Sequence, residues 1–197
     1  MKLTEQKRLH ILDAAEKLFH RQGMLHTSMD QLATEAQVSK RTVYNHFATK
    51  ELLFQAMLQR MFTQLAQVPE VQFSASEPIA QQLLRIALNE TALLTSEPFL
   101  RVARVALLQL MQQPELAQTL SELAPGCQRY LGRFLQQATD AGVLAVKDID
   151  FAAKQFIYQL KALVFYPALF GMPAADAAEL NYITEQSVQM FLARYQA

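Results

Sequence analysis

Apolar residues recur every three or four positions along most of the chain, and runs that alternate between apolar and polar residues are almost absent. A spacing of this kind is typical of amphipathic α-helices, whereas alternation is typical of half-buried strands. Glycine and proline, which interrupt helices, number only five and seven. The pattern therefore predicts an all-α protein.

The first third of the chain is predicted to hold four helices. The first covers about 4–22 and stops at Gly23, a residue suited to the left-handed conformation just past a helix. The second begins at Thr27 or Ser28, because each has a residue three positions later, Asp30 or Gln31, with which a capping box can form. It ends near residue 36. Ser39 and Thr49 can cap the third and fourth helices, which cover about 40–47 and 50–67.

The rest of the chain is predicted to form a larger helical body of its own. The stretch VPEVQFSASEP (68–78) has the composition of a linker, and prolines or Gly142 mark the helix ends that follow it. The expected helices are about 78–94, 98–113, 114–123, 125–141, 150–170 and 174–195. We therefore expect two domains: 1–48, a helix-turn-helix domain, joined by helix 49–67 to a body at 68–197.

The second and third helices are separated by only a few residues, which is the sequence form of a helix-turn-helix. At about 100° per residue, Arg41 and Asn45 lie opposite the apolar Val43, with Thr42 and Tyr44 beside them. Guanidinium, amide and hydroxyl groups on one short helix suit the major groove of DNA. The other interpretation is that this is merely a solvated helix face.

Charge and histidine content change the picture only slightly. The chain is neutral, but residues 1–60 carry nine Lys and Arg against six Asp and Glu, so the first part is +3 and the rest −3. This excess is consistent with a polyanionic partner for the first module. The four histidines do not share the spacing of metal ligands, no glycine-rich loop or nucleophile motif is present, and Cys127 is alone. We therefore expect no metal, no cofactor and no enzyme activity.

The run TSMDQLATEAQVSKRTVYNHFATKELLFQAM (27–57) resembles the DNA-binding module of the TetR family of transcriptional regulators. The resemblance covers about residues 8–58. It implies that Arg41 reads bases, with Lys40 second, and that Thr27 offers a hydroxyl to a phosphate. The full set of expected DNA contacts is Thr27, Ser28, Lys40, Arg41, Thr42, Tyr44, Asn45, His46 and Lys50. Two residues depart from the family pattern: Gln37, where glycine is usual and a left-handed backbone would be strained, and Arg41, where many members have a small residue.

The resemblance also implies an arrangement of about nine helices, in which the last two long helices pair with their symmetry mates in a homodimer. Apolar stripes on the two segments are compatible with such a four-helix bundle, although the same stripes would also suit packing inside the monomer. The residues expected at this dimer interface are Phe156, Leu160, Leu163, Val164, Leu180, Ile183, Val188, Phe191 and Leu192.

The middle helices are apolar enough to line a pocket for a lipophilic molecule, with a few polar groups to orient it. A packed core containing an ion pair is the alternative. The residues expected at this pocket are Glu90, Phe99, Arg101, Arg104, Met111, Cys127, Tyr130, Phe134, Tyr158 and Phe165.

Together these features predict a cytoplasmic, homodimeric repressor that binds a palindromic operator in double-stranded DNA. A small apolar or amphipathic effector is expected to release it, and no membrane association is expected. Two alternatives remain: a DNA-bound regulator whose body recognises a protein, and a helical-bundle enzyme, for which no clustered catalytic residues are found.

Overall fold

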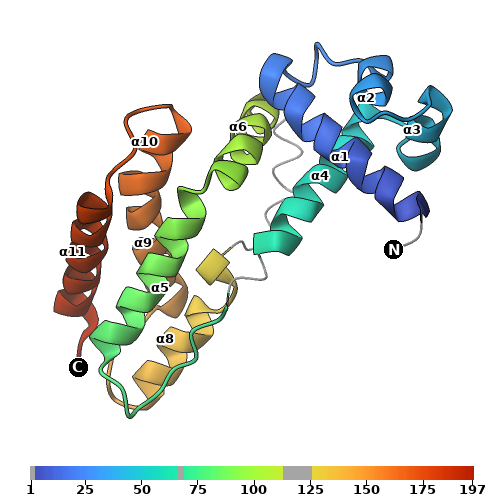
Figure 1. Cartoon of the computed structure of the whole chain (residues 1–197). Helices are drawn as coiled ribbons and strands as arrows, with labels where there is room; N and C mark the ends of the chain where they lie inside the picture. The colour runs from blue at the N-terminus through green and yellow to red at the C-terminus, as the bar shows by residue number, and fades with distance from the viewer. Residues whose placement is uncertain (1–2, 66–68, 113–125) are drawn as a thin grey trace. The chain divides into compact units, whose positions relative to one another are not determined.

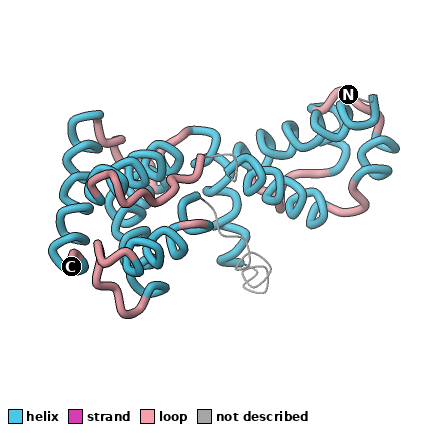
Figure 2. Tube along the Cα trace, turned by 90° about the horizontal axis from the view of Figure 1, so that it is seen from below, coloured by secondary structure: helices cyan, strands magenta, loops and turns pink. Residues whose placement is uncertain are grey.

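The computed structural model describes residues 3–65, 69–112 and 126–197, and these residues form helices and connecting loops (Figure 2). No strand occurs in these ranges; Leu144 and Gln196 form an isolated bridge. The predicted all-α fold is confirmed. The described part holds nine helices when α9, η2 and α10, which follow one another without a break, are counted as one.

The chain divides into two compact units. The described part of the first contains residues 3–64 and 101–112, and that of the second contains residues 65, 69–100 and 126–197. Helix α6 (Glu97–Gln112) thus contributes most of its length to the first unit. This grouping by contacts differs from the predicted body, which takes in every residue after 67; the predicted domain assignment stays a prediction.

The first unit is built on four helices that lie close to their predicted positions: α1 (Leu3–Gln22), α2 (Met29–Glu35), α3 (Lys40–His46) and α4 (Lys50–Leu65) (Figure 1). Ser28, not Thr27, caps α2, because the Ser28 hydroxyl accepts from the amide of Gln31 and the Gln31 side chain accepts from the amide of Ser28. Gly23 follows α1 at φ +80°, as predicted.

The core of this unit holds α3 against α1 and α2. Ile11, Leu32 and Val43 are fully buried, one from each helix. The inward-facing side chains of α2 are buried, and Val38 in the turn that follows α2 is half-buried. Arg60 of α4 lies 2.6 Å from Asp13 and 3.0 Å from Glu16, so ion pairs also connect α4 with α1. Helix α3 is therefore held in place by the contacts of its buried side with α1 and α2.

The second unit contains α5 (Ile79–Leu94), the 3-10 turn η1 (Gly126–Arg129), α8 (Leu131–Asp140), α9 (Ile149–Leu160), the π-helical turn η2 (Lys161–Phe165), α10 (Tyr166–Leu169) and α11 (Ala177–Tyr195). Helix α11 packs on α5 and α9, and α8 packs on α9. The predicted helix 125–141 is divided at Tyr130, and the last helix starts after Asp176, whose carboxylate accepts from the amide of Glu179. The predicted segment 114–123 lies outside the described residues.

One hydrophobic core runs through the second unit. Its members include Leu83 and Ile86 of α5, Phe134 of α8, Phe156 of α9 and Phe191 of α11, each at most 4% exposed. The rings of Phe156 and Phe191 meet edge to face with centroids 5.2 Å apart. Among the residues that the structure describes, no helix is long and apolar enough to cross a membrane.

Candidate nucleic-acid interface

Helix α3 presents a polar face to solvent because its single buried residue, Val43, points into the core of the first unit. Arg41 and Asn45 are exposed, and Tyr44 is 45% exposed. Thr42 is half-buried and its hydroxyl lies 2.8 Å from that of Ser39, the residue that caps the helix. The structure therefore brings the predicted guanidinium, amide and phenol groups together on one accessible surface.

The turn between α2 and α3 fixes the direction in which α3 leaves. Gln37 has φ +54°, the one non-glycine residue with a positive φ among those described. The amide of Val38 then donates to the carbonyl of Ala33 over 3.0 Å, which closes the turn. The left-handed conformation predicted for Gln37 is confirmed. Its backbone strain is the energetic cost of closing this turn.

Two lysines among the expected DNA contacts already have partners in the chain without DNA. The Lys40 ammonium lies 2.7 Å from a carboxylate oxygen of Asp30 on α2, and this hydrogen-bonded pair raises the pKa of Lys40. The Lys50 ammonium donates to the carbonyl of Met24 over 2.9 Å and to that of Leu25 over 3.4 Å. Lys50 therefore secures the turn after α1, a role that was not predicted from the sequence.

The Thr27 hydroxyl, which is predicted to contact a phosphate, is hydrogen-bonded within the chain. The side chain of Thr27 is 1% exposed, and its hydroxyl donates to the carbonyl of Gly23 over 2.8 Å. Ser28 is exposed, but its hydroxyl accepts from the amide of Gln31. These two residues thus build the start of α2, and their predicted contacts with DNA stay predictions.

His46 and Arg8 lie at the end of α3. His46 is half-buried beside the ring of Phe47, and the Arg8 guanidinium of α1 lies 5.2 Å from the centre of that ring. Sequence analysis missed Arg8, because its proximity to α3 depends on how α1 crosses the motif. The predicted surface therefore gains one further cation.

Two family models match the chain, and together they cover most of its length. The first, described as bacterial regulatory proteins of the tetR family, matches residues 11–57. The second, described as the C-terminal domain of an AefR-like transcriptional repressor, matches residues 81–197. The chain belongs to the TetR family. It is accordingly a DNA-binding transcriptional regulator, a class of protein that is not an enzyme.

Solved structures of TetR regulators resemble this one over its whole length. A TetR family regulator from Pseudomonas syringae pv. tomato is 36% identical, covers 98% of this chain and 99% of its own, and superposes with a TM-score of 0.83. A structure called the flavonoid-responsive regulator FrrA is 27% identical over 98% of both chains, with a TM-score of 0.80.

Curated relatives match the chain over a smaller share of its length. The regulator HbdR from Aromatoleum is 34% identical over 79 residues, which span 40% of this chain but only 34% of that protein. An uncharacterised regulator from Haemophilus influenzae is 27% identical over 78% of each. The assignment of this chain to the TetR family thus rests on both units. None of these relatives identifies its operator or its effector.

The predicted dimer residues of this TetR regulator fall into two groups. Phe156, Leu160, Val164, Val188 and Phe191 are at most 4% exposed, so they are buried within the single chain, and their place at a dimer interface stays a prediction. Leu180, Ile183 and Leu192 are half-buried, and Leu163 is 47% exposed. The exposed apolar residues that sequence analysis missed lie beside them: Tyr166, Phe170, Met172, Tyr182 and Met190.

Part of the predicted effector pocket does come together in the second unit. The Glu90 carboxylate, 3% exposed, accepts from the amide of Cys127 over 2.8 Å. Burial raises the pKa of Glu90, raises that of Cys127 and raises that of Tyr130 to about 12. The Tyr130 hydroxyl is buried and finds no acceptor among the described residues. Phe134 lies in the same core, and Phe99 contacts Phe165 with ring centroids 5.5 Å apart.

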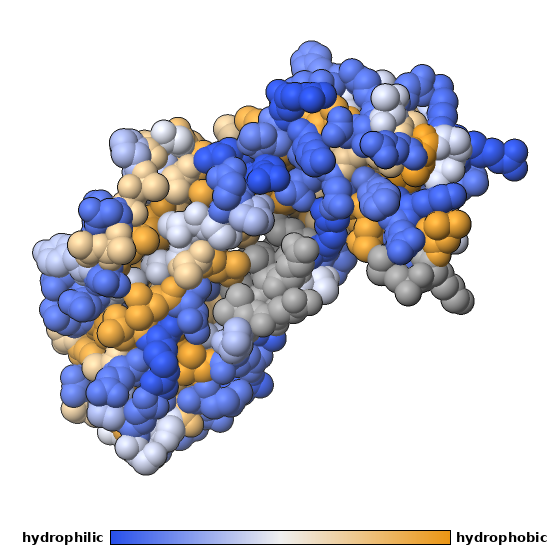
Figure 3. Space-filling view, viewed as in Figure 1, coloured by the Kyte–Doolittle hydropathy of each residue, from blue (hydrophilic) through white to orange (hydrophobic). Residues whose placement is uncertain are grey.

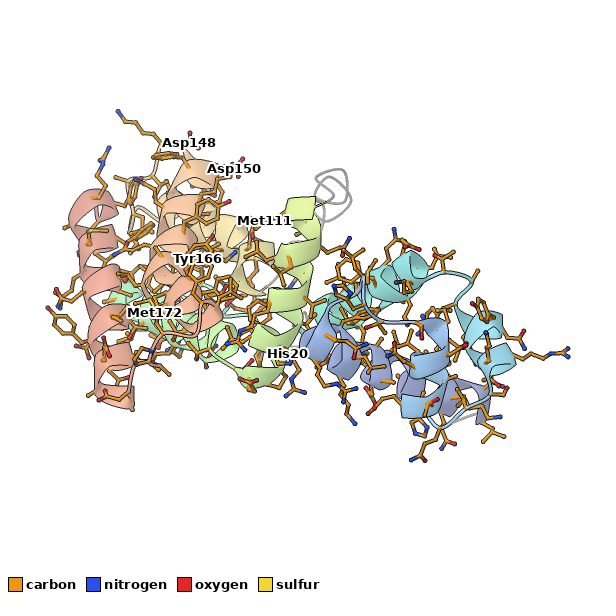
Figure 4. All side chains as sticks on the ribbon, turned by 90° about the horizontal axis from the view of Figure 1, so that it is seen from above. His20, Met111, Asp148, Asp150, Tyr166 and Met172 are labelled. Atoms are coloured by element: carbon orange, nitrogen blue, oxygen red, sulfur yellow. The ribbon has the colours of Figure 1, made fainter. Side chains whose placement is uncertain are left out.

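Other predicted pocket residues lie elsewhere. Tyr158 is 54% exposed, and Met111, which is labelled in Figure 4, is 73% exposed, so neither lines a buried pocket. Arg101 lies 3.8 Å from Glu16 of α1, and Arg104 is half-buried in the first unit. An amphipathic pattern in the sequence shows which residues share one face of a helix, but it does not show which element packs on that face.

Proposed function

We propose that this regulator is a homodimeric repressor whose two copies of α3 read the half-sites of a palindromic operator, and that a small apolar or amphipathic effector releases it. The observation that carries the proposal is the exposed polar face of α3, with Arg41 and Asn45 held outward by the buried Val43. Hydrophilic residues also dominate the visible surface of the N-terminal module (Figure 3).

The proposed division of labour follows from side-chain chemistry. Arg41 reads a base, because a guanidinium can donate two hydrogen bonds to one guanine edge. Lys40 and Lys50 contact DNA phosphates, which replace or join the acceptors that these lysines have in the chain without DNA. The rest of the DNA-contacting surface consists of Thr42, Tyr44, Asn45 and His46. A single module of this size contacts few base pairs, and two modules about 34 Å apart, or a multiple of that, read enough to be specific.

The dimer is supported by the apolar surface of the second unit. Phe170 is 70% exposed, Tyr182 65% and Met190 58%. The Gln159 amide of α9 lies 4.0 Å from the sulfur of Met190 on α11, so these two exposed side chains are neighbours. Exposed apolar side chains of this kind favour an interaction site, and a second copy of the chain is the occupant that the proposed palindromic operator requires.

Repression and effector binding are supported by different facts. The C-terminal family model is named for a repressor, and one relative, FrrA, is named as flavonoid-responsive. In this chain Glu90, Cys127 and Tyr130 bring an acceptor and two donors into an apolar core, which suits an effector with few polar groups. The effector then favours a spacing of the two α3 helices that no longer fits successive major grooves.

Selection of bound sequences from a random duplex pool, performed with the full chain at about physiological salt, tests the operator part. A palindromic site is expected. With that site, fluorescence anisotropy with and without the flavonoid naringenin tests the effector part, and release by naringenin in the wild type but not in a Tyr130→Phe variant is expected. Enrichment of a single half-site would contradict the dimer.

Binding of naringenin without any change in operator affinity would contradict release by an effector. In that case the alternative, a DNA-bound regulator whose second unit recognises a protein, takes precedence. The exposed aromatic residues of α10 and α11 would then be its contact surface.

A further inference from the structure

The guanidinium of Arg8 lies over the ring of Phe47, the residue that ends α3, at 5.2 Å from the centre of that ring. Arg8 precedes the fully buried Ile11 and Leu12 by one turn of α1, so it lies on the side of α1 that faces the core. Helix α1 packs on α3 in the first unit (Figure 1). Arg8 is therefore the point at which the packed side of α1 reaches the end of α3.

The ring of Phe47 gives this guanidinium a fixed position beside α3. Phe47 is 4% exposed, and its amide donates to the carbonyl of Val43 over 2.8 Å, which ties it to the last turn of the helix. A cation is attracted to the face of an aromatic ring, and Arg8 is itself half-buried. Because its stem is already packed, the side chain loses little further freedom when its head binds an anion.

The guanidinium of Arg8 is held in place but not neutralised. It forms no hydrogen bond and no ion pair with the residues that the structure describes, and none of its nitrogens is buried. Other cations of the first unit differ, because Arg60 pairs with two carboxylates of α1 and Lys40 pairs with Asp30. The five N–H donors of an arginine lie in one plane. A ring that covers one face of this plane leaves the N–H groups at its edges free for an anion.

The end of α3 lies close to a DNA strand when the helix occupies the major groove. Helix α3 has seven residues and is about 10 Å long, close to the groove width of about 12 Å. The second helix of a helix-turn-helix places its first residues against base edges, so its last turn meets the sugar-phosphate backbone at the groove edge. Phe47 follows directly after that last turn. A cation held on its ring therefore lies where a phosphate is expected.

We propose that Arg8 is a phosphate-binding residue of the DNA interface and that Phe47 is the residue that positions it. The guanidinium donates to the oxygens of one phosphate, which can accept two parallel N–H hydrogen bonds from an arginine. Since every nucleotide carries a phosphate, the contact adds affinity but no sequence preference. This inference rests on the proposed function in one respect, that α3 enters the major groove; it depends neither on the dimer nor on the effector.

The test uses the full chain, a short mixed-sequence DNA duplex and the duplex recovered by selection, with fluorescence anisotropy measured across a salt series. Arg8→Gln removes the charge. It is expected to weaken binding to both duplexes about tenfold at low salt for each bound module, the effect of one charged hydrogen-bonded contact. The slope of log affinity against log salt should fall by about 0.9 for each bound module. Arg8→Lys keeps the charge and should retain the wild-type slope.

Arg194→Gln is the matched control for Arg8→Gln. The Arg194 guanidinium also lies 5.2 Å from the centre of an aromatic ring, that of Tyr195, but on α11 in the second unit. Its replacement removes the same charge and the same kind of ring contact, and it should change neither the affinity nor the slope. Circular dichroism shows that each variant is folded. Weaker binding by Arg8→Gln with a wild-type slope, or an equal fall of the slope in Arg8→Lys, would overturn the phosphate contact.

Phe47→Leu tests the positioning role of the ring. Leucine keeps an apolar side chain in the core but offers no aromatic face to the guanidinium. Binding is expected to weaken about threefold, the effect of one cation–π contact, and to weaken by less when Arg8→Gln is already present. Equal weakening in the two backgrounds would overturn this role.

Arg41→Ala separates this inference from the proposed function. If Arg41→Ala weakens binding to the selected duplex and Arg8→Gln does not, the assignment of Arg8 is wrong and α3 remains the DNA-contacting helix. If neither variant weakens binding, α3 does not contact DNA, and the proposed function fails together with this inference.

Discussion

The ammonium of Lys40 lies 2.7 Å from the carboxylate of Asp30, so the first cation of α3 is paired with α2 before any DNA arrives. Both side chains are well exposed, 59% and 63%. A surface ion pair of this kind contributes little to stability. Its larger effect is on DNA binding, because a phosphate must compete with Asp30 for Lys40 and is repelled by the carboxylate.

Replacing Asp30 with Asn is therefore expected to tighten binding to all duplexes. At about 6 Å from a phosphate in water, removal of one carboxylate charge gives about a threefold gain in affinity at low salt. Fluorescence anisotropy across a salt series measures it. Asp150→Asn on α9 makes the same change of net charge outside the DNA module and should have no effect. Weaker binding by Asp30→Asn would mean that the pair is needed to orient Lys40.

Arg41 and Lys50 should respond differently to replacement with Ala. Loss of Arg41 removes base readout, so about 1–3 kcal/mol of discrimination at one operator position should be lost. Lys50→Ala should weaken binding to all sequences about equally, and it should also lower the free energy of unfolding by about 1 kcal/mol, because the carbonyls of Met24 and Leu25 lose their donor. Selection of bound sequences and urea unfolding measure the two effects. Identical sequence preferences in both variants would contradict the assignment.

Gln37 carries backbone strain that glycine would relieve. At φ +54° a side chain costs about 1 kcal/mol, so Gln37→Gly is expected to raise the free energy of unfolding by about that amount. Urea unfolding of the full chain measures it. Gln37→Ala keeps the β-carbon and should bring no comparable gain. A destabilised glycine variant would show that the Gln37 side chain makes a contribution larger than its strain.

The exposed apolar surface of the second unit predicts where charge prevents dimerisation. Met190→Glu and Tyr166→Glu should each convert the dimer to a monomer, since a symmetric interface places each new charge in a desolvated contact. Light scattering after gel filtration measures the mass, and circular dichroism should show unchanged helix content. Met111→Glu, at a residue 73% exposed on α6, serves as the control. A dimer that persists in both variants would place the interface elsewhere.

Glu90 gives stability a specific dependence on pH. Below 4.5 its carboxyl is protonated in the folded and the unfolded chain and adds no penalty. As pH rises through the folded pKa, which burial raises, the unfolded chain has already lost its proton and the folded state is penalised. The wild type should therefore lose stability relative to Glu90→Gln between acid and neutral pH in urea unfolding.

Glu77 is the matched comparison for Glu90. Its hydrogen bonds with Arg85 lower the pKa of its carboxyl, so its contribution is present above 4.5 and lost as pH falls through the folded pKa. The wild type should thus gain relative to Glu77→Gln as pH rises, which is the opposite slope. Stability differences from the wild type that change with pH in parallel for the two variants would contradict the opposite pKa shifts of the two carboxyls.

Local patterns in the sequence were sufficient for the helices of the first unit. The stop at Gly23, the short helices joined by a tight turn and the strain at Gln37 depend on residues within a few positions of one another, and each is confirmed. The outward face of α3 also follows from its own period once Val43 is recognised as buried. These features determined the fold class and the family.

Only the tertiary structure decided which faces and which charges are free. Phe156 and Phe191 lie on stripes that suit a partner helix, yet they pack on each other inside the chain, because apolar periodicity does not distinguish a core from an interface. Lys40 and Asp30 are ten residues apart, and Lys50 and Met24 are further apart. Contacts between distant segments set these outcomes, and a helical period carries no information about them.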